Sequence, residues 1–241
     1  MISVRTKLYF STENLILQQF FVFTFPERHD KMCSYLYFSF LRGQTMDSNF
    51  FALISRMRYI ARWGLMRNAL PENIQEHSHM VAVLAHALGV IRRDIFHQPC
   101  DVNALATAAL YHDASEILTG DLPTPIKYHN AEIMSAYHAV EDLAVQKLLG
   151  MLPPELRETY ADVLAEDKDG DIYPLVKAAD KLSAYIKCIE ERKAGNNEFL
   201  SAEAQTRAAL DASPLPEVQY FLEHFIPAFE RDLDELGAIG Q

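Results

Sequence analysis

Apolar residues recur every three or four positions along most of this chain, which is the period of an α-helix. After residue 46, no alternation of apolar and polar residues indicates a strand. The first two apolar stripes are Phe50, Leu53, Ile54, Met57 and Ile60, then Val81, Leu84, Ala85, Leu88 and Ile91. The next two are Ile133, Tyr137, Val140, Ala144 and Leu148, then Leu175, Ala179, Leu182, Ile186 and Ile189. These stripes predict helices over 48–62, 74–93, 133–150 and 174–194.

Capping residues and helix breakers place the ends of these helices. Asn73 followed by Glu76 resembles a capping box at a helix N-terminus. Asp101 can cap a further helix, rich in Ala and Leu, over residues 102–117. That helix must end before residues 119–125, because a glycine and two prolines there oppose its continuation.

Prolines also open helices, since the first turn of a helix needs no backbone N–H bond. Pro154 opens a short helix near 154–165, and Pro174 opens the one that runs to Gly195. Two or three more helices follow, divided by Pro214, Pro216 and Pro227. The fold class predicted for residues 46–241 is therefore all-α, as one helical domain.

The first 45 residues differ in composition from the rest. They hold seven of the fourteen Phe residues and no Ala. With five basic and three acidic residues their net charge is +2, which leaves 17 basic and 30 acidic residues, or −13, for 46–241. Three interpretations compete: an unstructured extension translated upstream of a start at Met46, an added β-prone element, or an export signal around residues 15–23. We expect no catalytic residue here.

The charge and the cysteines exclude some classes of protein. A net charge of −11 argues against a protein that wraps a nucleic-acid polymer, which needs Lys and Arg to displace counterions. Cys33, Cys100 and Cys188 are scattered, which fits a reducing compartment and predicts a cytoplasmic protein. No run of about 18 apolar residues is present, so no membrane-spanning helix is expected.

Two imidazoles and two carboxylates are the strongest candidates for a metal site. His77 lies in the first turn of its predicted helix, and His112 and Asp113 lie near the end of theirs. Asp180 lies on a face of small and apolar residues, where a carboxylate is costly to bury without a cation or hydrogen bonds. Such a donor set suits a borderline divalent ion. Each residue alone is more commonly structural or solvated; the adjacent pair with distant partners favours a metal.

Glu116 follows His112 by four residues and Asp113 by three, so all three can border one helix face. One interpretation is a carboxylate beside the metal that moves a proton; the other is an exposed residue at a helix end. The remaining histidines are expected to be structural or exposed: His79, His86, His97, His129, His138 and His224. Between Asp113 and Asp180 the only histidines are His129 and His138, and because neither has a partner spaced for a helical pair, we expect one metal.

These residues resemble the H…HD…D signature of the HD-domain metal-dependent phosphohydrolases. The resemblance extends to the bacterial HD-domain 5′-deoxynucleotidases, from about Met46 to about Leu236. It is carried by 62–68 (RWGLMRN), 76–78 (EHS), 111–116 (YHDASE), 119–125 (TGDLPTP) and 194–199 (AGNNEF). It implies a single HD-domain helical fold and phosphate release from deoxyribonucleoside 5′-monophosphates. Residues 1–45 have no counterpart in the family.

The resemblance also implies a cofactor and partners. His77, His112, Asp113 and Asp180 would hold one divalent transition metal. Co²⁺ or Mn²⁺ is expected first, and Zn²⁺, Cu²⁺ or Fe²⁺ would also suit the site. The expected substrate is a deoxyribonucleoside 5′-monophosphate, the expected assembly is a homodimer, and neither a nucleic-acid polymer nor a membrane is an expected partner.

Residue roles follow from the same resemblance. Arg62 would orient the phosphate, Trp63 would lie against the sugar and help to reject a 2′-hydroxyl, and Glu116 would be the acid-base group. The residues expected to contact substrate are Arg62, Trp63, His77, Asp113, Asp121, Leu122, Pro123, Thr124 and Asp180. Considered without the family, Arg62 is an ordinary basic residue at a helix end, and Trp63 is an ordinary core or dimer anchor.

The chemistry is also consistent with the residues themselves. A phosphomonoester dianion needs charge neutralisation and an in-line water. A metal and the guanidinium of Arg62 would neutralise the phosphate. Two alternatives stay open: cleavage of triphosphates or cyclic dinucleotides by another HD branch, and a nucleotide sensor without activity. The lack of long basic tracts argues against the first, and the complete ligand set with Glu116 argues against the second.

Overall fold

The computed structural model describes residues 4–6, 21–23, 48–127, 129–165 and 170–237. The chain divides into two compact units, Met1–Asp47 and Ser48–Gln241. In the first unit, β1 (Val4–Thr6) and β2 (Phe21–Phe23) pair antiparallel. The rest of the 1–45 extension, most of the signal-like run 15–23 and Cys33 lie outside the described residues.

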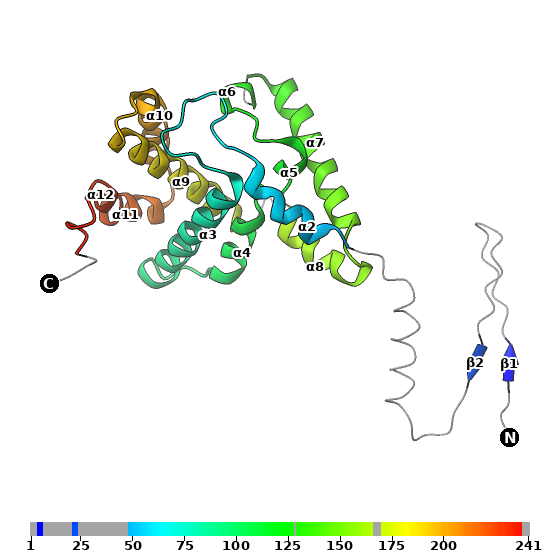
Figure 1. The fold of residues 1–241 in the computed structure, drawn as a ribbon. Helices are drawn as coiled ribbons and strands as arrows, with labels where there is room; N and C mark the ends of the chain where they lie inside the picture. Colours follow the sequence, from blue (N-terminus) through cyan, green and yellow to red (C-terminus); the bar gives the residue numbers. More distant parts are fainter. Residues whose placement is uncertain (1–3, 7–20, 24–47, 128, 166–169, 238–241) are drawn as a thin grey trace. The chain divides into compact units, whose positions relative to one another are not determined.

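The described part of the second unit is helical, which confirms the predicted fold class (Figure 1). Its α-helices are α2 (Phe50–Ile54), α3 (Ile74–Val90), α4 (Val102–Tyr111), α5 (Glu116–Thr119), α6 (Thr124–Lys127), α7 (Ala131–Gly150), α8 (Pro154–Leu164), α9 (Tyr173–Lys193), α10 (Leu200–Asp211), α11 (Pro216–His224) and α12 (Ile226–Phe229). Short 3₁₀ or π segments are η2 (Ser55–Tyr59), η3 (Ile91–Ile95) and η4 (Asn197–Phe199). Among the described helices, none is long and apolar enough to cross a bilayer.

Most predicted boundaries agree with the structure within two residues, and two do not. The segment predicted as a helix over 48–62 is α-helical only to Ile54 and then tightens into a 3₁₀ turn. The helix predicted over 102–117 ends at Tyr111, because Ala114 N–H donates to the Tyr111 carbonyl (2.9 Å) in a three-residue turn. The His-Asp pair therefore lies in a turn between α4 and α5 rather than on a helix face with Glu116.

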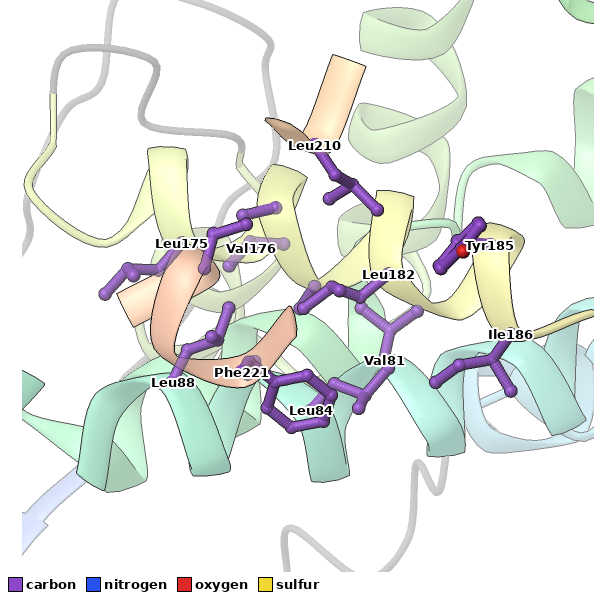
Figure 2. Packing of buried hydrophobic residues seen from close by; sticks show 14 of the residues in the cluster. Val81, Leu84, Leu88, Leu175, Val176, Leu182, Tyr185, Ile186, Leu210 and Phe221 are labelled. Atoms are coloured by element: carbon purple, nitrogen blue, oxygen red, sulfur yellow. The ribbon is translucent and has the colours of Figure 1, made fainter. Parts of the chain in front are cut away.

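The main core forms where α3, α4, α9, α10, α11 and α12 bury their apolar faces. Val81 and Leu84 of α3 belong to one buried cluster with Leu182 and Ile186 of α9 (Figure 2). Phe221 of α11 is a member of the same cluster. Burying a large apolar side chain contributes about 1.5–3 kcal/mol. This packing holds α3 against α9, and these two helices carry the first and last of the candidate metal ligands.

Candidate metal centre and active site

The four candidate ligands converge although they lie far apart in the sequence. His77 comes from the first turn of α3, His112 and Asp113 from the turn after α4, and Asp180 from the middle of α9. His77 Nε2 lies 3.0 Å from Asp180 Oδ1 and 3.6 Å from Asp113 Oδ2, and His112 Nε2 lies 3.2 Å from Asp113 Oδ2. Ligand atoms of His77, His112 and Asp180 all lie within 4.8 Å of one another.

The hydrogen bonds of the two imidazoles leave the inward nitrogens available. His112 Nδ1 is 2.7 Å from the Ala109 carbonyl, which can only accept, so the proton of the neutral ring is on Nδ1. His77 Nδ1 lies 3.1 Å from Ser183 Oγ. Both Nε2 atoms are buried, and neither makes a well-aligned hydrogen bond among the described residues, although carboxylate oxygens lie 3.0 and 3.2 Å away. A fixed Nδ1 partner with a free Nε2 is the usual arrangement of a metal-binding histidine, so the residues present fit a divalent ion.

The two carboxylates are held in the ionised form that metal binding requires. Burial opposes ionisation of Asp113, but His112, His77 and Arg62 outweigh it and lower the pKa of Asp113. Burial likewise opposes ionisation of Asp180, but the close contact with His77 and the charges of His77 and His112 lower the pKa of Asp180. Burial lowers the pKa of His112, but Asp113, Asp180 and the Ala109 carbonyl together raise it above its usual value.

Arg62 and Trp63 lie beside this cluster in the loop before α3. Arg62 Nη1 donates to Asp113 Oδ2 (3.3 Å), and Arg62 Nε donates to Glu72 Oε2 (3.1 Å). Trp63 Nε1 donates to the same Glu72 oxygen (3.0 Å), and its ring lies against Phe199 with centroids 5.2 Å apart. The structure thus brings the predicted phosphate-orienting residue next to the predicted metal ligands.

Glu116 begins α5 and is almost fully buried (6% exposed). Burial, with the nearby carboxylates of Asp113 and Asp121, raises the pKa of Glu116 to about 10. Its Oε2 is buried with no hydrogen-bond partner among the described residues. Buried carboxyl groups with raised pKa values are typical of catalytic acids, whereas the alternative of an exposed helix end does not agree with this burial.

The segment after α5 brings Asp121 near Arg62, Asp113 and Glu116. Gly120 has φ +74°, which favours glycine, and the chain then turns through Asp121, Leu122 and Pro123, all half-buried. Burial raises the pKa of Asp121 against the attraction of Arg62. The predicted loop ran to residue 125, but α6 already begins at Thr124. The side chain of Thr124 lies outside the described part of the structure. Asp121 is the member of this segment whose charge interacts with Arg62.

A cavity of 810 Å³ extends from the candidate metal ligands to residues of α7 and α9. His112, Asp113 and Asp180 line one part of it, and Lys127 and Tyr173 line another. Its volume falls in the usual range for small-ligand sites.

Four residues around the site were not predicted. Glu72 holds Arg62 and Trp63, and Ser183 contacts His77. Lys187 and Glu191, both buried, bind the backbone of residues 69 and 70 and so hold the loop after Trp63. One available signal was the polar stripe that Ser183, Lys187 and Glu191 form with Asp180 along α9, at helical spacing.

Solved structures with the same fold indicate the class of protein to which this chain belongs. A HD-domain phosphohydrolase from Listeria innocua matches with a TM-score of 0.67 and 25% identity, over 75% of this chain and 88% of that one. The PH0347 protein from Pyrococcus horikoshii shares the fold with a TM-score of 0.58 and 21% identity, over 76% of this chain and 98% of that one. Fold and ligand cluster together define an HD-domain phosphohydrolase.

The sequence comparison is more specific. Residues 49–229 match the family described as 5′-deoxynucleotidase YfbR-like. The 5′-deoxynucleotidase YfbR of Shigella boydii is 50% identical over 192 residues, covering 79% of this chain and 96% of that protein. The protein of the same name from Escherichia coli K12 gives the same figures. The chain belongs to the YfbR-like 5′-deoxynucleotidase family, which confirms the predicted resemblance.

Proposed function

We propose that this protein is a metal-dependent 5′-deoxynucleotidase that converts deoxyribonucleoside 5′-monophosphates to deoxyribonucleoside and phosphate and discriminates against ribonucleotides. The observation that carries the proposal is the pair of buried, unpartnered imidazole Nε2 atoms facing two ionised carboxylates, with Arg62 bound to one of those carboxylates. Relatives that are 50% identical to this chain over 192 residues are named for this activity.

His77, His112, Asp113 and Asp180 would hold one divalent ion. Two nitrogen and two oxygen donors suit a borderline transition metal, so we propose Co²⁺ or Mn²⁺, with Zn²⁺, Cu²⁺ and Fe²⁺ also compatible with the donor set. When bound, such an ion supplies Lewis-acid polarisation of the phosphate and a water of lowered pKa.

Arg62 would bind the phosphate, and Trp63 and Asp121 would bind the sugar. Arg62 uses one N–H toward Glu72 and one toward Asp113, which leaves further guanidinium donors for two phosphate oxygens. The rigid Trp63 ring against the sugar would leave a 2′-hydroxyl without a hydrogen-bond partner, at a cost of about 1–3 kcal/mol. Leu122, Pro123 and Thr124 would complete the nucleotide site.

Glu116 would act as the general acid. Its raised pKa keeps a proton on the carboxyl group at neutral pH. As water attacks phosphorus and the bond from phosphorus to the 5′ oxygen breaks, Glu116 would donate that proton to the 5′ oxygen of the leaving deoxyribonucleoside. A proton delivered in the transition state typically accelerates a reaction by 10²–10⁴-fold.

Phosphate release tests the proposal directly. The purified full-length protein is incubated with Co²⁺ or Mn²⁺ and a panel of deoxyribonucleoside and ribonucleoside 5′-monophosphates, with a deoxyribonucleoside triphosphate in parallel. Phosphate is expected from the deoxyribonucleoside monophosphates. Release from none of them contradicts the proposal, and turnover of the triphosphate alone would assign a different HD-domain reaction.

The assembly and location stay predictions from the sequence. A homodimer would have twice the 27.4 kDa mass of the chain, which light scattering of the purified protein measures. A cytoplasmic location is predicted from the cysteine pattern and would be checked by cell fractionation.

A further inference from the structure

One carboxylate outside the predicted site contacts both of the residues that are proposed to bind substrate. Glu72 Oε2 accepts a hydrogen bond from Arg62 Nε at 3.1 Å and from Trp63 Nε1 at 3.0 Å. The side chains of Glu72 and Arg62 are 14% and 12% exposed, so this ion pair is largely shielded from solvent. A shielded, charge-assisted contact is stronger than a surface ion pair and holds its partners in one geometry.

The backbone fixes the position of Glu72. Arg62 N–H donates to the Glu72 carbonyl (3.0 Å), and a bridge between Ala61 and Asn73 closes the loop at that point. Asn73 is also the N-cap of α3, the helix that carries His77. Glu72 is therefore tied both to the loop that bears the substrate residues and to the helix that bears a metal ligand.

Trp63 needs such an anchor, because its backbone has φ +60°, a region that residues other than glycine adopt only when their surroundings impose it. Its ring contacts Phe199, and its indole N–H is bound by Glu72. Arg62 is in a similar position: Glu72 binds its Nε edge and Asp113 binds Nη1, so the plane of the guanidinium is set by carboxylates at two points.

We propose that Glu72 is a positioning residue that sets the guanidinium of Arg62 and the ring of Trp63 in a fixed mutual geometry, and thereby supports selection of the deoxyribose sugar. This inference rests on the proposed function of Arg62 and Trp63 as phosphate and sugar contacts. The Glu72 side chain binds Arg62 and Trp63 rather than a candidate metal ligand, so it acts through these two side chains.

The test uses fluorescence and kinetics, because Trp63 is the only tryptophan in the sequence. Glu72→Ala should shift the emission of the free protein to longer wavelength and increase its quenching by acrylamide, since the indole is no longer held in place and becomes more accessible to water. With substrate, the ratio of kcat/KM for deoxyribonucleotides over ribonucleotides should fall about fivefold or more, and kcat/KM for the deoxyribonucleotide about 10–100-fold. Metal content should stay at the wild-type value.

Glu72→Gln is the conservative variant, because an amide oxygen can still accept from the indole N–H while the charge that holds Arg62 is lost. It should keep wild-type emission and lose part of the kcat/KM. Glu76→Ala is the matched control: Glu76 lies four residues after Glu72, and its carboxylate accepts from the Asn73 backbone N–H rather than from Arg62 or Trp63. It should leave emission and the sugar ratio unchanged.

Wild-type emission and an unchanged sugar ratio in Glu72→Ala would overturn the inference, as would a loss of metal equal to the loss of activity. Should Glu72→Ala fail to fold, Glu72→Gln still decides, since a wild-type kcat/KM in that variant also overturns it. The fluorescence of the free protein does not depend on any substrate. Changed emission in a protein that hydrolyses no nucleotide would therefore contradict the proposed function while leaving the contact of Glu72 with Trp63 intact.

Discussion

Two polar clusters lie along one face of α9, and they differ in how completely their groups are paired. Toward the start of the helix, Asp180 and Ser183 meet His77 and His112 at the candidate metal site. Two turns further on, Lys187 and Glu191 bind each other and the backbone of residues 69 and 70. The second cluster is buried, and the first is buried except for Asp180, whose side chain is 35% exposed; burial of polar groups is costly in each.

The second cluster has no unpaired side-chain atom among the described residues, whereas in the first both imidazole Nε2 atoms face carboxylates without making a well-aligned hydrogen bond. A buried carboxylate that accepts from Lys187, Asn196 and two backbone N–H groups stabilises a loop. Unpartnered donor atoms that point at one another and at carboxylates instead await a ligand. Unsatisfied groups, rather than burial or charge, distinguish the site for chemistry from the structural cluster.

The largest expected effect is at the unpaired cluster. His112→Ala should remove the bound metal and lower phosphate release by about 10³-fold or more, because the ion loses a fixed ligand and the chemistry it supplies. Without metal, the free energy of unfolding of His112→Ala should lie within about 2 kcal/mol of that of the metal-free wild type. The reason is that the His112 Nε2 contributes no hydrogen bond to the fold. Metal analysis, phosphate release and denaturant unfolding measure these three quantities. A metal-bound, active variant would remove His112 from the site.

The opposite outcome is expected at the paired cluster. Glu191→Ala should lower the free energy of unfolding by about 3–5 kcal/mol, because it leaves the Lys187 ammonium and two backbone N–H groups buried without their partner. The folded fraction should keep its metal. The measurement is urea unfolding of the metal-free proteins.

Asp211→Ala is the matched control, since it removes an exposed ion pair with Arg207 at the same i, i+4 spacing and should change stability by less than about 1 kcal/mol. If Glu191→Ala and Asp211→Ala cost the same, the Lys187–Glu191 pair is no more than a surface contact.

Acid should weaken the paired cluster in a defined pH range. Burial alone would raise the pKa of Glu191, but hydrogen bonds from Lys187, Asn196 and the two backbone N–H groups lower it to about 2, from 4.5. Because the folded-state pKa is the lower one, ionised Glu191 stabilises the fold above about pH 4.5, and this contribution is lost as the pH falls toward 2. It is on the order of 3 kcal/mol.

The stability difference between wild type and Glu191→Gln should therefore be constant above pH 5 and shrink below it. Unfolding titrations in EDTA at several pH values measure this difference without a contribution from metal loss. A difference that stays constant from pH 6 to pH 3 would mean that Glu191 titrates in the folded state as it does in the unfolded chain.

Sequence patterns were sufficient to predict the helices and the candidate metal ligands. They did not predict the side chains that orient the site residues. The apolar stripe and capping box of α3 predicted its start, and Pro174 predicted the start of α9 within one residue. The periodicity of α4 continued past Tyr111, so it could not show the turn that carries His112. Glu72 and Glu191 act on partners that only the folded chain brings near, and Lys187 with Glu191 has the spacing of an ordinary surface pair.

The smallest effect is expected at Ser183, which lies on α9 between the two clusters. Its hydroxyl is 3.1 Å from His77 Nδ1, so Ser183→Ala leaves that nitrogen without a partner and frees the ring orientation and tautomer. Metal affinity should fall about 10–100-fold, with little change in kcat at saturating metal. Ser78→Ala makes the same chemical change at a buried hydroxyl that has no hydrogen-bond partner in the described structure. Of these two serines, Ser183 contacts His77 Nδ1 and Ser78 does not. Metal titrations that show equal losses of affinity in both variants would therefore mean that the effect is a loss of packing.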